Sequence, residues 1–259
     1  MARRRADPPA RRPNVGARLS ARAETASPTQ PPAPAVSSAA IDLEGLERRY
    51  GERPALAGVT LALEAGRTLG VFGSNGAGKT TLLRVLATLL RPHGGRARVL
   101  EAELPDEAWK VRGRVGYLGH EPLLYRELSA RENLRFYARL HGVALARVEE
   151  LLVAVGMERR AADPVRDLSR GMVQRVAAAR SVLHDPPLLL LDEPRAGLDP
   201  AAADLLEPLI GRASNRTRVL VTHDLEGGLA ESDVALGLRG GRQILSGRAN
   251  LDALRELYR

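Results

Sequence analysis

Short apolar runs bounded by glycine, proline or charged turns recur along most of this chain. Such runs are typical of buried strands in a parallel sheet. The most distinct of them lie at Thr68–Phe72, Ala97–Leu100, Val115–Leu118, Leu188–Leu191 and Arg218–Thr222. Other segments are patterned like partly buried strands or a closing strand pair, and they lie at Ile41–Tyr50, Val59–Leu63, 233–238 and 242–246.

Between the strands, apolar residues recur at helical spacing. The predicted helices lie at Lys79–Leu90, Ala130–Leu140, Ala146–Val155, Gly171–Leu183 and Leu251–Tyr258. The fourth has one apolar face, formed by Met172, Val176, Ala179 and Leu183. Strands that alternate with helices predict an α/β fold in which helices cover both faces of a parallel sheet. The block at roughly 120–185 is mostly helical in pattern and predicts a helical subdomain.

A glycine-rich turn joins the strand that ends at Phe72 to the helix that begins at Lys79. It fits the P-loop pattern G-x-x-x-x-G-K-[ST] with Gly73, Ser74, Asn75, Gly76, Ala77, Gly78, Lys79 and Thr80, and Thr81 follows. Glycines let backbone N–H groups wrap a phosphate, and the positive end of the helix adds to the field. We expect Lys79 to reach the β- and γ-phosphates of ATP and Thr80 to ligate Mg²⁺. A chance glycine-rich turn is the alternative.

An acidic pair follows the four consecutive leucines Leu188–Leu191. The apolar run predicts a central strand that brings Asp192 to its carboxyl end beside the P-loop, where the carboxylate can hold Mg²⁺ through water. Glu193 would then face the γ-phosphate and polarise an attacking water. An acidic pair after a core strand is common by itself, so this interpretation depends on the P-loop upstream.

Further segments match the motifs of a single family. Leu168–Arg175, with the sequence LSRGMVQR, resembles the signature of the ATP-binding cassette (ABC) ATPases. Ala196–Asp199 resembles their D-loop, and Thr222–Asp224 resembles the segment that carries their switch histidine. Tyr50 stands where the family places an aromatic residue that stacks on adenine. Each feature alone has an ordinary explanation, but their shared order and spacing over about residues 41–247 identify an ABC ATPase.

The resemblance implies a P-loop NTPase of ABC type with a RecA-like core, an antiparallel β subdomain and an inserted helical subdomain. It also implies that two copies pair head to tail, and that Ser169 and Gly171 of one copy contact the ATP held by the other. His223 would act with Glu193 and Lys79 in hydrolysis. The implied cofactors are ATP and Mg²⁺. The implied partners are a second ATPase domain and an integral membrane permease, at the cytoplasmic face of the inner membrane.

The sequence departs from the family pattern at several positions. His120 stands at the place of the usual Q-loop glutamine, so we expect it to contact the nucleotide site in its stead. Arg170 and Met172 replace Gly and Gln in the signature, and Arg195 stands where Ser or Thr is usual. Ser169 and Gly171 remain, so the phosphate contact of the signature should survive.

The charge of the chain is unevenly placed. The net charge of +8 is at first sight typical of a protein that binds nucleic acid or an anionic membrane. Residues 1–40, however, hold seven arginines against Asp7 and Glu24, a net charge of +5, which leaves only +3 for the rest. These residues are also rich in proline and poor in large apolar side chains, which predicts a disordered tail. We therefore expect the ATPase domain at 41–259 and no specific nucleic-acid partner.

Other classes of P-loop protein fit less well. Soluble ABC proteins of DNA repair carry a long coiled coil between P-loop and signature, whereas 88 residues separate Lys79 from Leu168. Ribosome-associated ABC factors need two ATPase domains in one chain, and nucleotide kinases and GTPases lack the signature. The sequence also contains no cysteine and no apolar run of 18 or more residues, so it offers neither a thiolate metal site nor a membrane span. A transport ATPase with a separate permease is favoured.

Residues 116–137 resemble one subgroup of these transport ATPases. The segments Gly119–Pro122 and Leu128–Tyr137 are similar to the ATPase of the cytochrome c maturation haem exporter, in which the substitution at His120 is a mark of the subgroup. We therefore expect a haem exporter. A drug or lipid exporter is the alternative, because Leu86–Pro92 and Ala196–Asp199 have the style of those ATPases.

Overall fold

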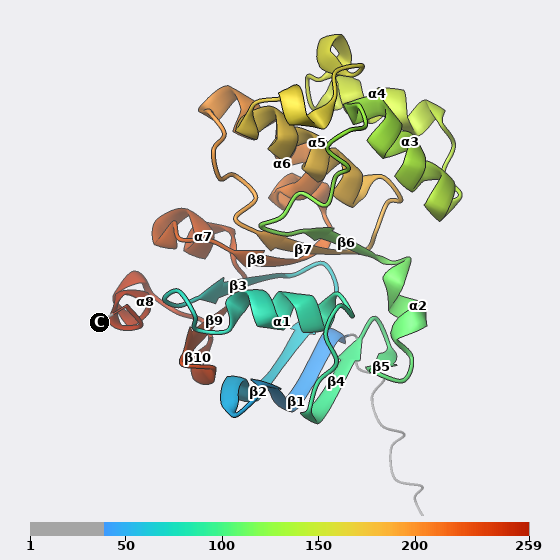
Figure 1. Cartoon of the computed structure of the whole chain (residues 1–259). Coiled ribbons are helices and arrows are strands. Elements are labelled where there is room, and N and C mark those ends of the chain that lie inside the picture. Colours follow the sequence, from blue (N-terminus) through green and yellow to red (C-terminus); the bar gives the residue numbers. More distant parts are fainter. Residues whose placement is uncertain (1–38, 259) are drawn as a thin grey trace, which may run out of the picture. The chain divides into compact units, whose positions relative to one another are not determined.

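The computed structural model describes residues 39–258, which form two β-sheets and the helices around them (Figure 1). The predicted tail over residues 1–40 lies outside the described residues apart from its last two positions, with which the first strand already begins. Among the described residues, no helix is both long enough and apolar enough to cross a membrane.

One sheet is antiparallel and has the strand order β2-β1-β4-β5. Its strands are β1 (Ala39–Tyr50), β2 (Arg53–Glu64), β4 (Gly94–Val99) and β5 (Ala102–Leu104). β1 and β2 form a hairpin whose last pair is Tyr50 with Arg53. β2 therefore begins before the predicted Val59, because its pairing with β1 continues through polar and exposed residues up to the turn. β5 was not predicted.

The second sheet has the strand order β10-β9-β3-β8-β7-β6. Its strands are β3 (Thr68–Phe72), β6 (Val115–Leu118), β7 (Leu188–Asp192), β8 (Thr217–Val221), β9 (Val234–Arg239) and β10 (Arg242–Gly247). β10 is antiparallel to β9, and the other neighbours are parallel. Every residue of β3, β7 and β8 is buried, as in central strands covered on both faces. The predicted α/β fold is confirmed.

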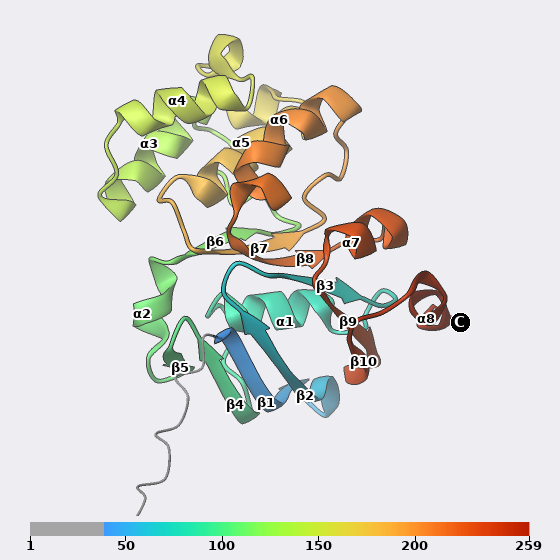
Figure 2. The same cartoon turned by 180° about the vertical axis from the view of Figure 1, so that it is seen from behind.

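Successive leucines of β7 point into different cores, because side chains alternate between the two faces of a strand. Leu188 and Leu190 join a core that also contains helix α1 (Lys79–Leu86) and the four-stranded sheet. Leu189 and Leu191 join a second core. The helices that supply most of it are α3 (Ala130–His141), α4 (Ala146–Ala154), α5 (Arg170–Val182) and α6 (Pro200–Ile210). Figure 2 shows α1 and this helix group on opposite sides of the six-stranded sheet.

Side-chain caps fix where the helices of the second core begin. Ser129 caps α3, Ser169 caps α5 and Asp199 caps α6, and each accepts a hydrogen bond from a backbone N–H group three residues further on. Such caps are each worth about 1 kcal/mol. Ser169 belongs to the signature and Asp199 ends the D-loop, so the caps of α5 and α6 fix the point at which each of these two motifs meets its helix.

Short elements complete the described part. They are α2 (Ala108–Arg112), α7 (Leu225–Glu231), α8 (Leu251–Glu256) and 3-10 turns at Glu158–Arg160, Val165–Asp167 and Arg212–Ser214. Residues of α8 and of the chain just after it pack on Phe72 in a small third core. Helix α1 ends at Leu86 and not at the predicted Leu90, because Thr88 takes up a left-handed conformation with φ of 61°.

Candidate nucleotide-binding site

The P-loop joins β3 to α1, and its backbone carbonyl groups bind the side chain of its lysine. Nζ of Lys79 donates hydrogen bonds to the carbonyl oxygens of Gly73 at 2.6 Å and Ser74 at 3.1 Å. The side chain is nearly buried, and this burial lowers the pKa of the ammonium group, while Asp192 and Glu193 raise it. The ammonium group is thus held by carbonyl groups that phosphate oxygens can replace as its partners.

Two glycines of the loop occupy places where a side chain does not fit. Gly73 and Gly78 have φ values of 144° and 110°. A Cβ atom at Gly73 would lie 2.2 Å from the carbonyl oxygen of Leu238 in β9, and one at Gly78 would lie 2.3 Å from that of Ala55 in β2. The loop backbone therefore approaches both sheets more closely than any other residue type would permit.

The hydroxyl group of Thr80 meets the carboxylate of Asp192. Thr80 Oγ1 donates to Asp192 Oδ2 at 2.9 Å. Asp192 is the last residue of β7 and is only 5% exposed. The two oxygen atoms come from α1 and β7, which the sheet places side by side. Oxygen ligands of this kind are what Mg²⁺ prefers, so these two residues fit the metal that a nucleotide site of this type uses.

Glu193 follows Asp192 in a left-handed conformation with φ of 52°. Its N–H group donates to the carbonyl of Val221 at 2.9 Å, which continues the pairing of β7 with β8. Oε1 is buried, lies 3.6 Å from Nε2 of His223 and has no hydrogen-bond partner among residues 39–258. Burial raises the pKa of the Glu193 carboxyl, and the neighbouring His223 lowers it. The carboxylate is therefore placed to accept a proton from a water molecule in the cavity.

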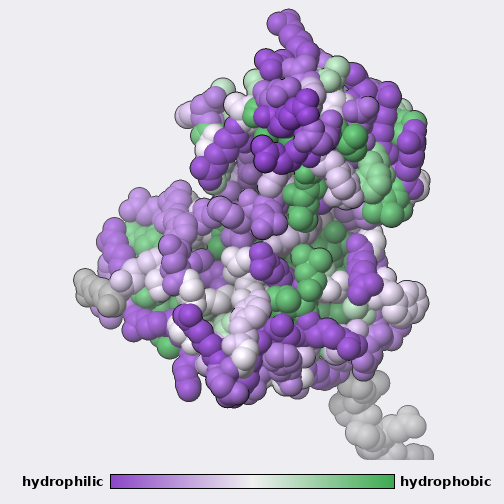
Figure 3. All heavy atoms as spheres, viewed as in Figure 1, coloured by the Kyte–Doolittle hydropathy of each residue, from purple (hydrophilic) through white to green (hydrophobic). Residues whose placement is uncertain are grey.

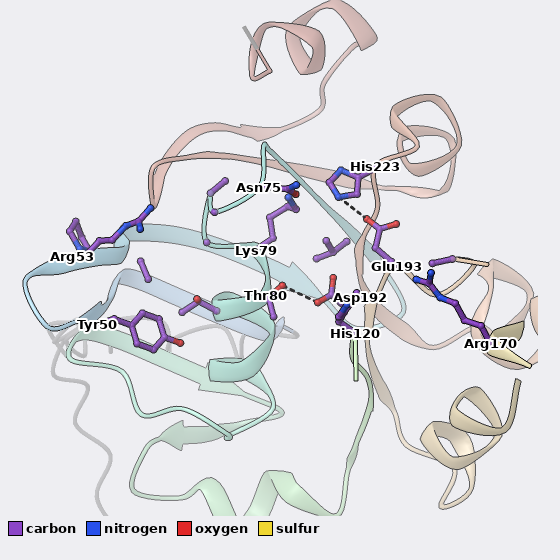
Figure 4. Close-up of a pocket in the computed structure, with 18 residues that line it drawn as sticks. Tyr50, Arg53, Asn75, Lys79, Thr80, His120, Arg170, Asp192, Glu193 and His223 are labelled. Atoms are coloured by element: carbon purple, nitrogen blue, oxygen red, sulfur yellow. Dashed lines mark hydrogen bonds and ion pairs between the residues drawn. The ribbon is translucent and has the colours of Figure 1, made fainter. Parts of the chain in front are cut away.

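A cavity of about 690 Å³ connects these groups (Figure 4). Most of the predicted site residues line it, namely Tyr50, Asn75, Gly76, Ala77, Gly78, Lys79, Thr80, Thr81, His120, Asp192, Glu193 and His223. Tyr50 and Glu193 lie at opposite ends in the view of Figure 4. The Tyr50 ring is half exposed, and the guanidinium group of Arg48 lies 5.2 Å from its centre.

Four predicted residues do not line this cavity. Gly73 and Ser74 act instead as acceptors for Lys79. Ser169 caps α5 through the N–H group of Met172 at 3.3 Å, and neither Ser169 nor Gly171 reaches the cavity of its own chain. This placement agrees with the expectation that the signature serves a second copy, but it leaves those two roles as predictions.

Other lining residues were not predicted: Arg53, Pro54, Ala55, Arg170, Ala196 and Val221. Arg53, Pro54 and Ala55 belong to β2 and reach the site because the hairpin pairs Arg53 with Tyr50. That pairing could have been anticipated from the Gly51-Glu52 turn. Arg170 had been noted as a departure from the signature pattern, but nothing in the sequence indicated that its side chain turns into the cavity.

Comparison with known proteins agrees with this geometry. Residues 56–196 match the family model of the ABC transporter. The chain is 40% identical to the daunorubicin resistance ATP-binding protein DrrA3 of Streptomyces coeruleorubidus over 223 residues. The aligned region covers 83% of this chain and 70% of that protein. The chain is 36% identical over 226 residues to the Nod factor export ATP-binding protein I of Ralstonia nicotianae, covering 85% and 70%. A fluoroquinolones export ATP-binding protein of Mycobacterium tuberculosis is 39% identical over 194 residues, covering 73% and 64%.

Solved structures show the same architecture. The ATP-binding subunit of an ABC transporter superposes with a TM-score of 0.76 at 30% identity, covering 84% of this chain and 98% of that one. A dimeric ATP-binding cassette in a post-hydrolysis state with ADP and Pi superposes with a TM-score of 0.73 at 26% identity, covering 81% and 99%. The fold and the site therefore define an ABC-type ATPase. The chain belongs to the ABC transporter family and is an ATP-binding subunit of such a transporter.

Proposed function

We propose that this chain is the ATP-hydrolysing subunit of an ABC exporter whose cargo is a drug-like or lipid-like organic molecule. The proposal is carried by the similarity of this chain to ATP-binding proteins that are named for drug resistance or for export. They are named for daunorubicin resistance, for Nod factor export and for fluoroquinolones export. All three names describe export or resistance by an ATP-binding protein, which supports the second of the two cargo classes predicted from the sequence.

The cavity supports a defined pose for ATP. The half-exposed Tyr50 ring stacks on adenine at the open end, where an aromatic face is accessible. The P-loop backbone surrounds the phosphates, and Lys79 exchanges the carbonyls of Gly73 and Ser74 for β- and γ-phosphate oxygens. Thr80 and Asp192 would hold Mg²⁺ with their side-chain oxygen atoms. Bound Mg²⁺ supplies positive charge that offsets the charge of the phosphate oxygens.

Hydrolysis then depends on Glu193 and His223. The Glu193 carboxylate lines the cavity and is the acceptor to which an attacking water gives its proton. His223, 3.6 Å away, orients this carboxylate and contacts the γ-phosphate side of the cavity, which it also lines. His120 lines the same cavity at the position of the usual glutamine and monitors the γ-phosphate in its place.

Two copies complete one another in this proposal. Ser169 and Gly171 lie at the start of α5 but outside the cavity of their own chain, so their N–H groups and the positive helix end are free to meet the ATP of a second copy. The dimeric cassette among the similar structures supports this pairing. Closure on ATP and opening after hydrolysis give the membrane partner two states to follow.

An apolar surface beside the helices is suited to a permease. Its large exposed side chains are Leu89, Leu123, Tyr125, Phe136 and Leu140, which are between 41% and 68% exposed. Leu89, Leu123 and Leu140 line a hollow of about 660 Å³ beside α3. Figure 3 shows hydrophobic side chains gathered over α3 and between it and α1. Exposed apolar clusters of this kind mark protein interaction sites, so we place the permease here, at the cytoplasmic face of the cell membrane.

The haem exporter of cytochrome c maturation is the second candidate. It is favoured by His120 and by the Phe136-Tyr137 pair, which lies in this surface, with a ring distance of 5.3 Å between the two. None of the relatives named above is named for haem, so this candidate ranks second.

Gene deletion separates the two cargo classes. In a host without a second copy, we expect deletion to increase sensitivity to amphiphilic drugs and to leave haem staining of c-type cytochromes unchanged. Complementation with the Glu193→Gln variant should fail, which ties the phenotype to ATP hydrolysis. Loss of c-type cytochromes with unchanged drug sensitivity would replace the drug or lipid cargo by haem and leave the ATPase assignment standing.

A further inference from the structure

Arg170 is the first residue of α5 and directly follows the Ser169 cap. Its side chain crosses the D-loop, since a Cβ atom at Gly197 would lie 3.4 Å from Cδ of Arg170 and 3.5 Å from its Nε. Figure 4 shows the guanidinium group extended from α5 toward Glu193. The side chain of Arg170 therefore leaves the signature and enters the nucleotide site of its own chain.

Two adjoining cavities share this arginine. Arg170, His120 and Glu193 line both the nucleotide cavity and a neighbouring cavity of about 370 Å³. Ser169 and Gly171, the residues on either side of Arg170, line neither of the two. One position of the signature thus faces the site in its own chain, whereas its neighbours face away from it.

The guanidinium group of Arg170 forms no hydrogen bond or ion pair with any residue of 39–258, although Asp192 and Glu193 line the same cavity. A nearby arginine shows the contrast, because Arg195 is paired with Glu207 and Glu231 at 2.7 Å each. An unpaired guanidinium that lines a phosphate site can donate two parallel hydrogen bonds to phosphate oxygens without first breaking an existing pair.

Arg170 also complements Lys79 in position. Lys79 reaches the cavity from the P-loop, and in the view of Figure 4 Glu193 lies between the two cations. Glu193 and Asp192 bring negative charge to the place where the γ-phosphate must lie for the water that Glu193 activates to attack it. A second cation on the far side of Glu193 offsets this repulsion between the carboxylates and the phosphate.

We propose that Arg170 binds the γ-phosphate of the ATP held by its own chain. The inference rests on the proposed function, because it requires that ATP occupies this cavity. The signature of this protein then contacts two different ATP molecules. Ser169 and Gly171 serve the ATP of the second copy, and Arg170 serves its own before the two copies have met.

Binding of nucleotides to the isolated chain tests the proposal first. At concentrations where the chain is monomeric, Arg170→Ala should weaken binding of a non-hydrolysable ATP analogue about tenfold, the loss of one charge-assisted contact. Binding of ADP, which lacks the γ-phosphate, should not change. Arg170→Lys should recover part of the loss. Arg159→Ala is the matched control, since Arg159 is an exposed arginine outside both cavities. Equal weakening of both nucleotides, or of neither, would overturn the proposal.

Dimers of two different variants then show whether Arg170 acts on the ATP of its own copy or on the ATP of the second copy. One copy is silenced by Lys79→Ala and Glu193→Gln, so that only the site of the other copy turns over. Arg170→Ala in the active copy should lower kcat at least tenfold, and the same change in the silenced copy should not. Ser169→Ala serves as the reference and should act from the silenced copy. A loss that appears only when Arg170→Ala is in the silenced copy would refute the proposal. Absence of any ATPase in the unmodified dimer would instead refute the proposed function.

Discussion

The hydroxyl group of Tyr258 accepts a hydrogen bond at 3.0 Å from the backbone N–H group of Gly73, the first glycine of the P-loop. The two residues are 185 positions apart and meet because α8 packs beside β3 on Phe72. Burial raises the pKa of the Tyr258 hydroxyl group, so this group stays neutral at physiological pH. The far end of the described chain thus supports the loop that binds phosphate.

Removal of this hydroxyl group should loosen the loop without unfolding the protein. We expect Tyr258→Phe to cost about 1 kcal/mol of unfolding free energy, because the buried N–H group of Gly73 loses its partner, and to raise the KM for ATP more than it lowers kcat. Urea denaturation and steady-state ATPase assays measure the two effects. Unchanged values of both would show that the contact is incidental.

Glu193 should be the base on which turnover depends. Glu193→Gln keeps the shape of the side chain but cannot accept a proton from water, so kcat should fall by about 10² to 10⁴ while ATP binding persists. The variant should accumulate as an ATP-bound dimer in size-exclusion chromatography. Turnover near that of the unmodified chain would exclude Glu193 from this role.

The raised pKa of Glu193 predicts the acid limb of the pH profile. The carboxyl group must be ionised to act as a base, and burial raises its pKa above the ordinary value of a glutamate. Activity should therefore fall with decreasing pH at a higher pH than an unperturbed glutamate would give, and should be restored as the pH rises. A profile of kcat/KM against pH measures this limb. An acid limb at or below the usual pKa of glutamate would contradict the assignment.

Metal dependence should report on Asp192. In the unmodified chain Thr80 Oγ1 donates to the Asp192 carboxylate at 2.9 Å. Asp192→Asn keeps an oxygen acceptor for this hydrogen bond but removes the charge that attracts Mg²⁺. We expect the Mg²⁺ concentration for half-maximal activity to rise about tenfold or more, with metal-free ATP binding little changed. Thr80→Ser retains the hydroxyl ligand and serves as the control. An Asp192→Asn variant with unchanged Mg²⁺ dependence would show that the carboxylate does not hold the metal.

The residues that the sequence predicted for the centre of the site line one cavity, because the motifs that carry them are each contiguous in sequence. The P-loop and the Asp192-Glu193 pair are each determined by local motifs, and β3 and β6 have the predicted bounds. A parallel sheet then brings the two motifs together without further information. His223 and Tyr50 also line the cavity, since each follows or ends a predicted strand.

What the sequence missed depends on tertiary contacts. Helix α7 contains two glycines, which have low helix propensity, and it forms under the Asp224 cap. Helix α6 begins at Pro200 under the Asp199 cap, in a segment for which the sequence pattern predicted no element. The direction of the Arg170 side chain depends on the absence of a side chain at Gly197 across the D-loop, a contact that no local pattern encodes.

The stability of the protein should depend on the ion pair between a buried arginine and its glutamate partner. Arg218 is 1% exposed and pairs with Glu231 at 2.9 Å. Glu231→Gln leaves this charge without a counter-charge and should cost about 3 kcal/mol of unfolding free energy. Glu226→Gln, on the exposed face of the same helix, should cost little. Adding Arg218→Met to Glu231→Gln should recover stability, because the uncompensated charge is then gone. Equal costs for the two glutamates in urea denaturation would contradict this account.

Leu140 should separate docking from hydrolysis. It is 68% exposed on α3 and lines the hollow assigned to the permease. A charge there meets solvent in the isolated chain, so Leu140→Glu should change the unfolding free energy by no more than about 0.5 kcal/mol and leave ATPase activity intact. In a complex with the permease the same charge would be buried without a partner, which should lower the yield of co-purified complex at least tenfold. Val153→Glu is the matched control, because Val153 is 62% exposed on α4 but lies outside the hollow. If both variants co-purify with the permease as well as the unmodified chain, the permease binds at another surface.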